Sequence, residues 1–281
     1  MAALTPTDHE RNRGFVWSDH QGPFRAITEA QAQSYDELGY FLLEDALSPA
    51  QVDQIVAEID PLETRQEALL RERFDGKFFI ARADEITFTT HLVQHSEILR
   101  SFTASSVLAD LCADLIGSDV RLYWDQAVYK KPDTEAPFPW HQDNGYAFVE
   151  PQQYLTCWIA LTDATVENGC PWVVPRLHRR GTLAHQYSDI GFICLSDPED
   201  AVPVPAPRGS IVVFSSLTPH STGPNTTADV RKAYIVQFAP AGAYVVRDEP
   251  GGDTAHVPAD DESRQYVVVR DGLPVTPPPM R

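Results

Sequence analysis

The sequence predicts an α+β protein, mainly β, whose main body is an antiparallel barrel or jelly roll. Helix signals dominate the first 118 residues, whereas from Val120 onward apolar and polar side chains alternate as they do in strands. Helices do not separate the later strands, which argues against the βαβ repeat of a parallel sheet. Because neither a linker nor a shift in composition divides the two parts, we expect a single domain over residues 1–281, with its core at about 30–240.

The N-terminal part contains several helix-start and helix-stop patterns. Thr followed three residues later by Gln is a capping box, Pro after Ser is typical of a first helical turn, and Gly ends a periodic apolar run. With the apolar residues around them, these patterns predict a helix from Thr28 to before Gly39, a strand at 40–43, a helix from Ser48 and a helix at 105–116.

Five segments after residue 119 are typical of strands, because they are rich in β-branched and aromatic residues and lie between Gly, Pro, Asn or Asp residues. They span residues 120–130, 154–161, 171–174, 210–215 and 232–238. Beyond Pro240 the chain is rich in proline and acidic residues, so we interpret 241–281 as a C-terminal extension in which only 266–269 packs on the body. The long segment 186–207 is either a lid or a disordered surface insertion.

The charge of the chain excludes some classes of partner. There are 22 Lys and Arg residues against 40 Asp and Glu residues, which gives a net charge of -18. Nucleic-acid binding needs a basic face, and docking on an anionic membrane needs a basic cluster, so neither is expected. Neither a secretory leader nor an apolar span of about 20 residues is recognisable, so we expect a cytoplasmic location. The four cysteines form no CxxC pair and are expected to be buried, reduced thiols. We therefore expect a small-molecule substrate and a monomer or homodimer.

The most informative segment is PWHQDNGY, at residues 139–146. His141 and Asp143 are two residues apart and project from the same face of an extended segment, so they can bind one metal ion together. His220, just past a predicted strand, is the best candidate for the third ligand of a 2-His-1-carboxylate iron(II) site, and Arg231 follows at the start of the next strand. An HxD pair alone occurs by chance in many proteins, but these four residues in this order favour a metal site.

His141-Gln142-Asp143, His220 and Arg231 together resemble the phytanoyl-CoA dioxygenase family of iron- and 2-oxoglutarate-dependent oxygenases. The resemblance covers about residues 30–240 and includes GYFLLEDALSPAQVDQI, YWDQAVYKKP and CWIALTDATVENGCPWVVPRLHRRG. It implies a double-stranded β-helix supported by N-terminal helices. It also implies Fe(II) bound by His141, Asp143 and His220, with 2-oxoglutarate and O2 as cosubstrates.

The same resemblance suggests which residues bind 2-oxoglutarate. The distal carboxylate of 2-oxoglutarate needs a planar bidentate donor, which Arg231 supplies better than a lysine would. Thr222 can add a hydroxyl hydrogen bond, although the family often has Ser at this position. By similarity, Gln126 and Lys130 reach into the barrel toward 2-oxoglutarate, and Trp158 packs near the metal.

The resemblance implies the oxidation of a small organic molecule with release of succinate and CO2, and we expect a hydroxylation in secondary metabolism. Halogenases of this type lack the carboxylate ligand, so Asp143 favours hydroxylation, or a desaturating or ring-forming variant. Asn144, Tyr146 and Phe148 are expected to line the substrate mouth. Two alternatives stay open: a non-catalytic protein that binds a metal or ligand, and an oxygen-independent cupin-type metal isomerase or hydrolase.

Overall fold

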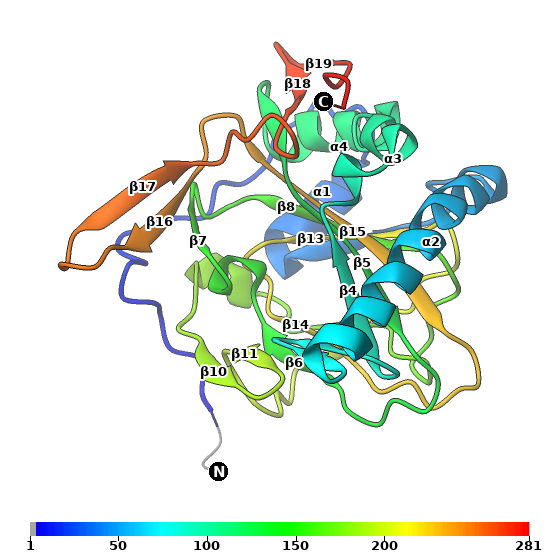
Figure 1. Ribbon diagram of the computed structural model, residues 1–281. Helices are drawn as coiled ribbons and strands as arrows, with labels where there is room; N and C mark the ends of the chain where they lie inside the picture. The colour runs from blue at the N-terminus through cyan, green and yellow to red at the C-terminus, as the bar shows by residue number, and fades with distance from the viewer. Residues whose placement is uncertain (1–3, 281) are drawn as a thin grey trace.

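Two antiparallel sheets lie face to face, and helices cover the outer side of the larger one (Figure 1). The computed structural model describes residues 4–280, so the ends of the predicted domain, residues 1–3 and 281, lie outside it. The helices are α1 (Glu29–Leu38), α2 (Pro49–Phe74), α3 (Glu97–Phe102) and α4 (Ser106–Leu115), with short 3-10 turns η1 (Leu92–Gln94), η2 (Asp143–Gly145) and η3 (Leu177–Arg180).

The larger sheet has the order β1-β13-β8-β15-β5-β4-β3-β2, and β18 and β19 extend it beside β5. Its strands are β1 (Tyr40–Leu43), β13 (Ile211–Ser215), β8 (Leu155–Ala160), β15 (Arg231–Pro240), β5 (Val120–Lys130), β4 (Ile86–Thr90), β3 (Ala81–Arg82), β2 (Lys77–Phe78), β18 (Val267–Arg270) and β19 (Leu273–Pro274). The mainly antiparallel, helices-first architecture predicted from the sequence is confirmed.

Three smaller sheets complete the structure. The sheet opposite the large one contains β12 (Val202–Pro203), β9 (Pro171–Val173), β14 (His220–Thr222) and β6 (Phe138–His141), in that order. The other two contain β7 (Phe148–Glu150), β16 (Tyr244–Asp248) and β17 (Thr254–Pro258), and the hairpin of β10 (Gln186–Ser188) with β11 (Gly191–Ile193).

The predicted helix signals are present where the sequence placed them. Thr28 and Ser48 each accept a hydrogen bond from the backbone of the Gln three residues later, and each forms a complete capping box. Gly39 follows α1 with φ of 90°, a left-handed conformation that glycine adopts without the steric penalty of a Cβ. These local interactions determine where α1 and α2 begin and where α1 ends.

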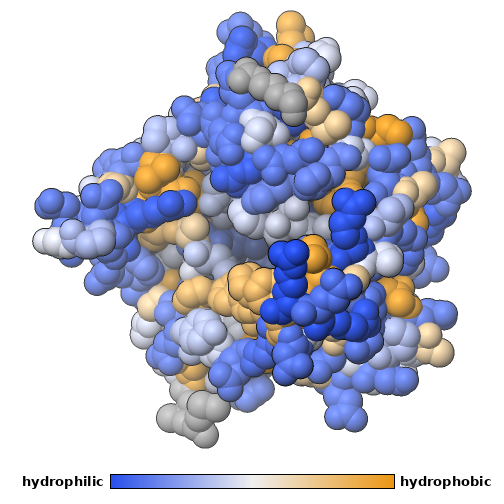
Figure 2. All heavy atoms as spheres, viewed as in Figure 1, coloured by the Kyte–Doolittle hydropathy of each residue, from blue (hydrophilic) through white to orange (hydrophobic). Residues whose placement is uncertain are grey.

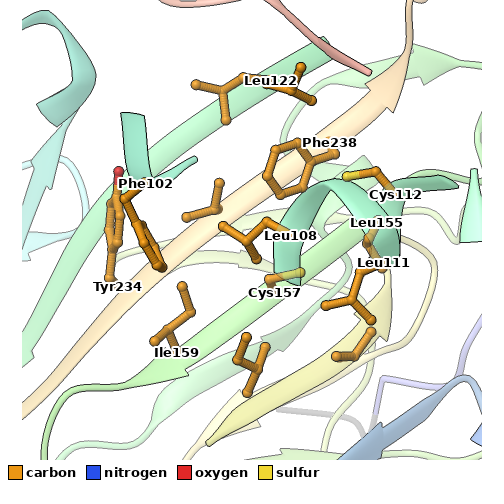
Figure 3. Close-up of a cluster of buried hydrophobic side chains, with 14 of the residues drawn as sticks. Phe102, Leu108, Leu111, Cys112, Leu122, Leu155, Cys157, Ile159, Tyr234 and Phe238 are labelled. Carbon is orange, nitrogen blue, oxygen red and sulfur yellow. The ribbon is translucent and has the colours of Figure 1, made fainter. Parts of the chain in front are cut away.

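Alternation along the strands separates a packing face from a face that points between the sheets. On β8, Leu155, Cys157 and Ile159 pack beneath α4 and against β15, as Figure 3 shows. Thr156 and Trp158 point the other way, toward the smaller sheet. Because successive side chains of a strand point to opposite faces, one hexapeptide supplies both the hydrophobic core and part of the site.

Three expectations need correction. The first 118 residues also contain β2, β3 and β4, and β4 pairs with β5 because its sequence ITFTT suits a strand. The C-terminal extension packs more extensively than predicted, since β16 pairs with β7 and buries Val245. The segment 186–207 is not a disordered insertion, because it forms the β10–β11 hairpin and β12.

All four cysteines are buried and free, as expected from their spacing. Among residues 4–280, no helix combines the length and the apolar character needed to cross a membrane. The cytoplasmic location stays a prediction.

Candidate active site

The two histidines of the candidate metal site meet across neighbouring strands. His141 ends β6, His220 begins β14, and the two residues are paired directly in the antiparallel register of the smaller sheet. Their ring centroids are 4.1 Å apart. The pairing of β6 with β14 therefore brings together two side chains that are far apart in the sequence.

Backbone hydrogen bonds orient both imidazole rings. Nδ1 of His141 lies 2.8 Å from the Pro139 carbonyl oxygen, and Nδ1 of His220 lies 3.0 Å from that of Thr218. A carbonyl oxygen can only accept a hydrogen bond, so Nδ1 must carry the hydrogen in each ring, and Nε2 keeps its lone pair. Burial lowers the pKa of His141 well below its usual value, and the nearby His220 lowers it further. The His141 ring is therefore neutral, as a metal ligand must be.

Asp143 supplies the carboxylate of this group. It lies in η2, directly after β6, and its Oδ1 is 3.7 Å from Nε2 of His220. Its other oxygen, Oδ2, accepts a hydrogen bond of 2.5 Å from the Thr156 hydroxyl on β8. One ligand atom from each of His141, Asp143 and His220 lies within 4.8 Å of the others, a spacing that can hold a metal ion. Two imidazoles and one carboxylate suit Fe(II) and leave coordination positions free.

Arg231 and Lys130 form a buried cationic pair on the adjacent part of the large sheet. The two residues are paired in register at the start of β15 and the end of β5, and both side chains are fully buried. Lys130 Nζ donates to the Gly223 carbonyl, just after β14, and Arg231 Nη1 donates to the Val128 carbonyl at 3.3 Å. Burial, with the charge of Arg231, lowers the pKa of Lys130 to about 7. Because Lys130 bonds to Gly223, the strand that carries His220 lies beside these two basic side chains.

Several polar atoms beside these cations lack a partner. In the part of the chain that the structure describes, Nε and Nη2 of Arg231 and Oγ1 of Thr222 are buried without a hydrogen bond. The guanidinium carbon of Arg231 lies 5.3 Å from the Trp158 ring centroid, so the plane of Trp158 borders one side of the group. Buried donors without partners are costly, and an anionic ligand with two oxygens would satisfy those of Arg231.

A cavity of about 470 Å³ opens beside the candidate ligands. His141 and Asp143 contribute to its wall, and so do Gln126 and Tyr146 from the predicted set. Asn144 and Phe148 are placed elsewhere, which corrects the expectation for both. The Asn144 amide bonds to the Thr182 hydroxyl and to the Val149 backbone, so it stabilises the loop after η2. Phe148 is buried on β7 and its ring packs against His9.

Several other residues of the site carry no motif that marks them in the sequence. Thr156 lies two residues before Trp158 on the same face of β8, so strand alternation was the signal that could have found it. Gln237 lines the cavity from β15, and its amide lies 3.4 Å from the Thr156 hydroxyl. The residues 78–81, between α2 and β4, line the mouth and carry no local motif that marks them.

Comparison with known proteins identifies the family. The sequence model described as "Phytanoyl-CoA dioxygenase (PhyH)" matches residues 35–233. The chain belongs to the phytanoyl-CoA dioxygenase family. As a member of this family it is a non-haem, Fe(II)- and 2-oxoglutarate-dependent oxygenase, which confirms the predicted family, enzyme class and cofactors.

Similar proteins cover most of the chain. It is 29% identical over 229 residues to a methylphosphonate hydroxylase of Gimesia maris, an alignment of 79% of this chain and 85% of that protein. It is 27% identical over 268 residues to phytanoyl-CoA dioxygenase domain-containing protein 1 of Mus musculus, with coverages of 78% and 92%. The crystal structure of EvdO2 from Micromonospora carbonacea var. aurantiaca, complexed with 2-oxoglutarate, matches with a TM-score of 0.64 and 25% identity over 82% of this chain and 98% of that one. This structural likeness confirms the predicted jelly-roll fold.

Proposed function

We propose that this phytanoyl-CoA dioxygenase family member hydroxylates a small organic molecule, with His141, Asp143 and His220 as its iron ligands. The support is the oriented donor set described above: two imidazoles whose Nε2 atoms are free of hydrogen, and a carboxylate positioned by Thr156. Bound there, Fe(II) would supply the oxidative chemistry in which 2-oxoglutarate and O2 yield succinate and CO2 while a C–H bond of the substrate becomes C–OH.

The unpaired donors of Arg231 are the single observation that carries the assignment of the 2-oxoglutarate site. Among the described residues, two nitrogens of this fully buried guanidinium have no partner, which is unfavourable unless a ligand binds them. The distal carboxylate of 2-oxoglutarate accepts two parallel N–H bonds and carries the opposite charge, so it fits the Arg231 fork. Lys130 adds a basic amine and Thr222 adds a hydroxyl donor on the same side. Trp158 borders the guanidinium, and Gln126 lies on the cavity wall.

Two finer parts of the proposal concern the organisation and the role of the protein. We treat residues 1–281 as one catalytic domain, and this is supported by a hydrophobic core that α1, β8, β15 and β18 share. A role in secondary metabolism is supported by the likeness, at 25% identity and a TM-score of 0.61, to the carbocyclase SnoK from nogalamycin biosynthesis.

Anaerobic titration tests the function. Addition of Fe(II) and then 2-oxoglutarate should produce a weak visible charge-transfer band, and admission of O2 with substrate should yield succinate. Asp143→Ala should lose the band, whereas Asp200→Ala, which removes an exposed carboxylate, should keep it. A wild-type protein that gives no band contradicts the proposal. Stable metal binding without succinate supports the non-catalytic alternative, and turnover under strict anaerobiosis supports an isomerase or hydrolase.

A further inference from the structure

The wall of the 470 Å³ cavity is dominated by aromatic rings. Its volume lies in the range that holds a drug-sized ligand. Eight of its seventeen lining residues are aromatic: Phe78, Phe79, Phe88, Tyr123, Trp124, Phe138, Tyr146 and Tyr154. Figure 2 shows a hollow near the centre of this face, with hydrophobic side chains along its lower border.

These rings are arranged in contact with one another and with a candidate iron ligand. The Phe138 and Tyr146 rings lie 5.0 and 5.2 Å from the ring of His141, both nearly perpendicular to it. Phe88 continues this wall, with its ring centroid 5.5 Å from that of Phe138. An apolar, flat group that enters the cavity would therefore contact ring faces and edges up to the metal.

The mouth continues the aromatic wall to the surface. Phe79 is 42% exposed, and its ring is stacked on that of Tyr187 from the β10–β11 hairpin at 6.3 Å. It also meets the edge of Phe192 at 6.3 Å. Phe78 beside it is 56% exposed. Exposed aromatic side chains at the opening of an aromatic cavity are typical of a surface that an apolar ligand covers.

The cavity wall contains no lysine or arginine among the described residues that line it. Apart from His141 and Asp143, which the proposed function assigns to iron, its polar groups are tyrosine hydroxyls, the Trp124 indole N–H, Gln66, Thr90, Gln126 and Gln237, all uncharged. Arg82 near the mouth donates to the Asp189 carbonyl and does not line the cavity. A phosphonate, a carboxylate or a coenzyme A thioester would have to leave water without a cationic partner, which is strongly unfavourable.

Resting on the proposed function, we infer that the substrate is an uncharged, ring-containing, largely apolar compound. Its rings would pack between the Phe138–Tyr146 wall and the aromatic mouth, and a hydroxyl or carbonyl of the substrate would bond to the Gln237 amide. This class differs from the substrate named for the methylphosphonate hydroxylase of Gimesia maris, which is an anion.

A pair of probes with the same ring system tests the charge preference. 2-Acetylnaphthalene and 2-naphthoate share a flat bicyclic skeleton, and only the second is anionic at pH 7.5. Their affinities for the protein loaded with Fe(II) and 2-oxoglutarate under argon are measured by calorimetry. We expect the ketone to bind at least about tenfold more tightly than the carboxylate, because only the carboxylate loses its hydration without a cationic partner.

Two variants with matched controls sharpen the test. Thr90→Arg places a cation on the cavity wall at an exposed position and should improve naphthoate binding about fivefold or more, while Thr90→Gln should not. Phe79→Ala should weaken binding of the ketone about three- to tenfold through lost ring contacts, while Leu273→Ala, an exposed apolar side chain on β19 away from the cavity wall, should not.

Equal or tighter binding of naphthoate to the wild-type protein would overturn the inference. So would the failure of both probes to bind to protein that shows the charge-transfer band, and in that case the proposed function stands. Absence of the band contradicts the proposed function instead, and the ratio of the two probe affinities for the metal-free protein then decides the inference.

Discussion

Replacement of Arg231 by methionine should separate the stability of the protein from its affinity for 2-oxoglutarate. Methionine retains the apolar stem but removes the guanidinium, two of whose nitrogens are buried without partners in the described chain. Each unsatisfied buried donor costs about 1–3 kcal/mol. The one bond that is lost, from Nη1 of the charged guanidinium to the Val128 carbonyl at 3.3 Å, contributes about 1.5–3 kcal/mol, no more than the two unsatisfied donors cost together. Without ligand, R231M should therefore be at least as stable as the wild type.

The same substitution should strongly weaken 2-oxoglutarate binding. A hydrogen bond to a charged group contributes about 1.5–3 kcal/mol, and about 1.4 kcal/mol corresponds to a tenfold change in Kd. Loss of one such bond thus raises the Kd at least about tenfold, and loss of both raises it about a hundredfold or more. The thermal shift that 2-oxoglutarate produces in the wild-type protein should then be nearly abolished in R231M at the same concentration.

Urea unfolding without ligand and anaerobic 2-oxoglutarate titration in the presence of Fe(II) measure the two quantities. Arg65→Met, which removes an exposed arginine on α2, is the control and should change neither. The reasoning is refuted if R231M binds 2-oxoglutarate with wild-type affinity. It is also refuted if the ligand-free variant loses several kcal/mol of stability, because the buried donors would then be satisfied in the wild type.

Three other substitutions test separate parts of the structure. Thr156→Val should raise the Kd for Fe(II) about tenfold by freeing the Asp143 carboxylate, whereas Thr226→Val should not. Competition with a metal chelator measures the Kd. An unchanged Kd in Thr156→Val would refute the role of Thr156 in positioning Asp143. Leu108→Ala, on the buried face of α4, should cost about 2–5 kcal/mol in urea unfolding and leave 2-oxoglutarate affinity unchanged; a loss below 1 kcal/mol, on the order of a surface change, would contradict its core position. Burial raises the pKa of Asp125 from its ordinary value of 3.8 to about 7, so between these two values the folded state holds a proton that the unfolded state has released. Stability should therefore fall as pH rises from about 4 to 7, and Asp125→Asn should flatten this dependence in urea midpoints; a profile identical to the wild type would refute it.

The parts of the site that the sequence predicts are those in which spacing along the chain determines geometry. His141 and Asp143 project together because side chains two apart share a face of an extended segment. Likewise, the capping boxes at Thr28 and Ser48 are local hydrogen bonds, and the structure places both where the pattern predicts them. The prediction for Asn144 also relied on local spacing, and it was wrong. Closeness to the ligands in sequence does not show that the Asn144 amide turns inward to Thr182.

The rest of the site depends on strand pairing and packing. Thr156 reaches Asp143 only because β8 lies under the loop after β6, and the unpaired donors of Arg231 follow from its burial between Trp158 and Lys130. The aromatic mouth is assembled from residues 78–81 and the β10–β11 hairpin, which are about a hundred residues apart in the chain.

The sequence by itself therefore determined the family, the arrangement of helices first and antiparallel strands afterwards, and the ligand types, since these depend on residue identity, periodicity and short spacing. Only the tertiary structure decided which atoms remain unpaired, which groups face the cavity, and that its wall carries aromatic rings without a lysine or arginine among the described lining residues. Burial and desolvation create these properties, and they arise when segments distant in sequence pack together.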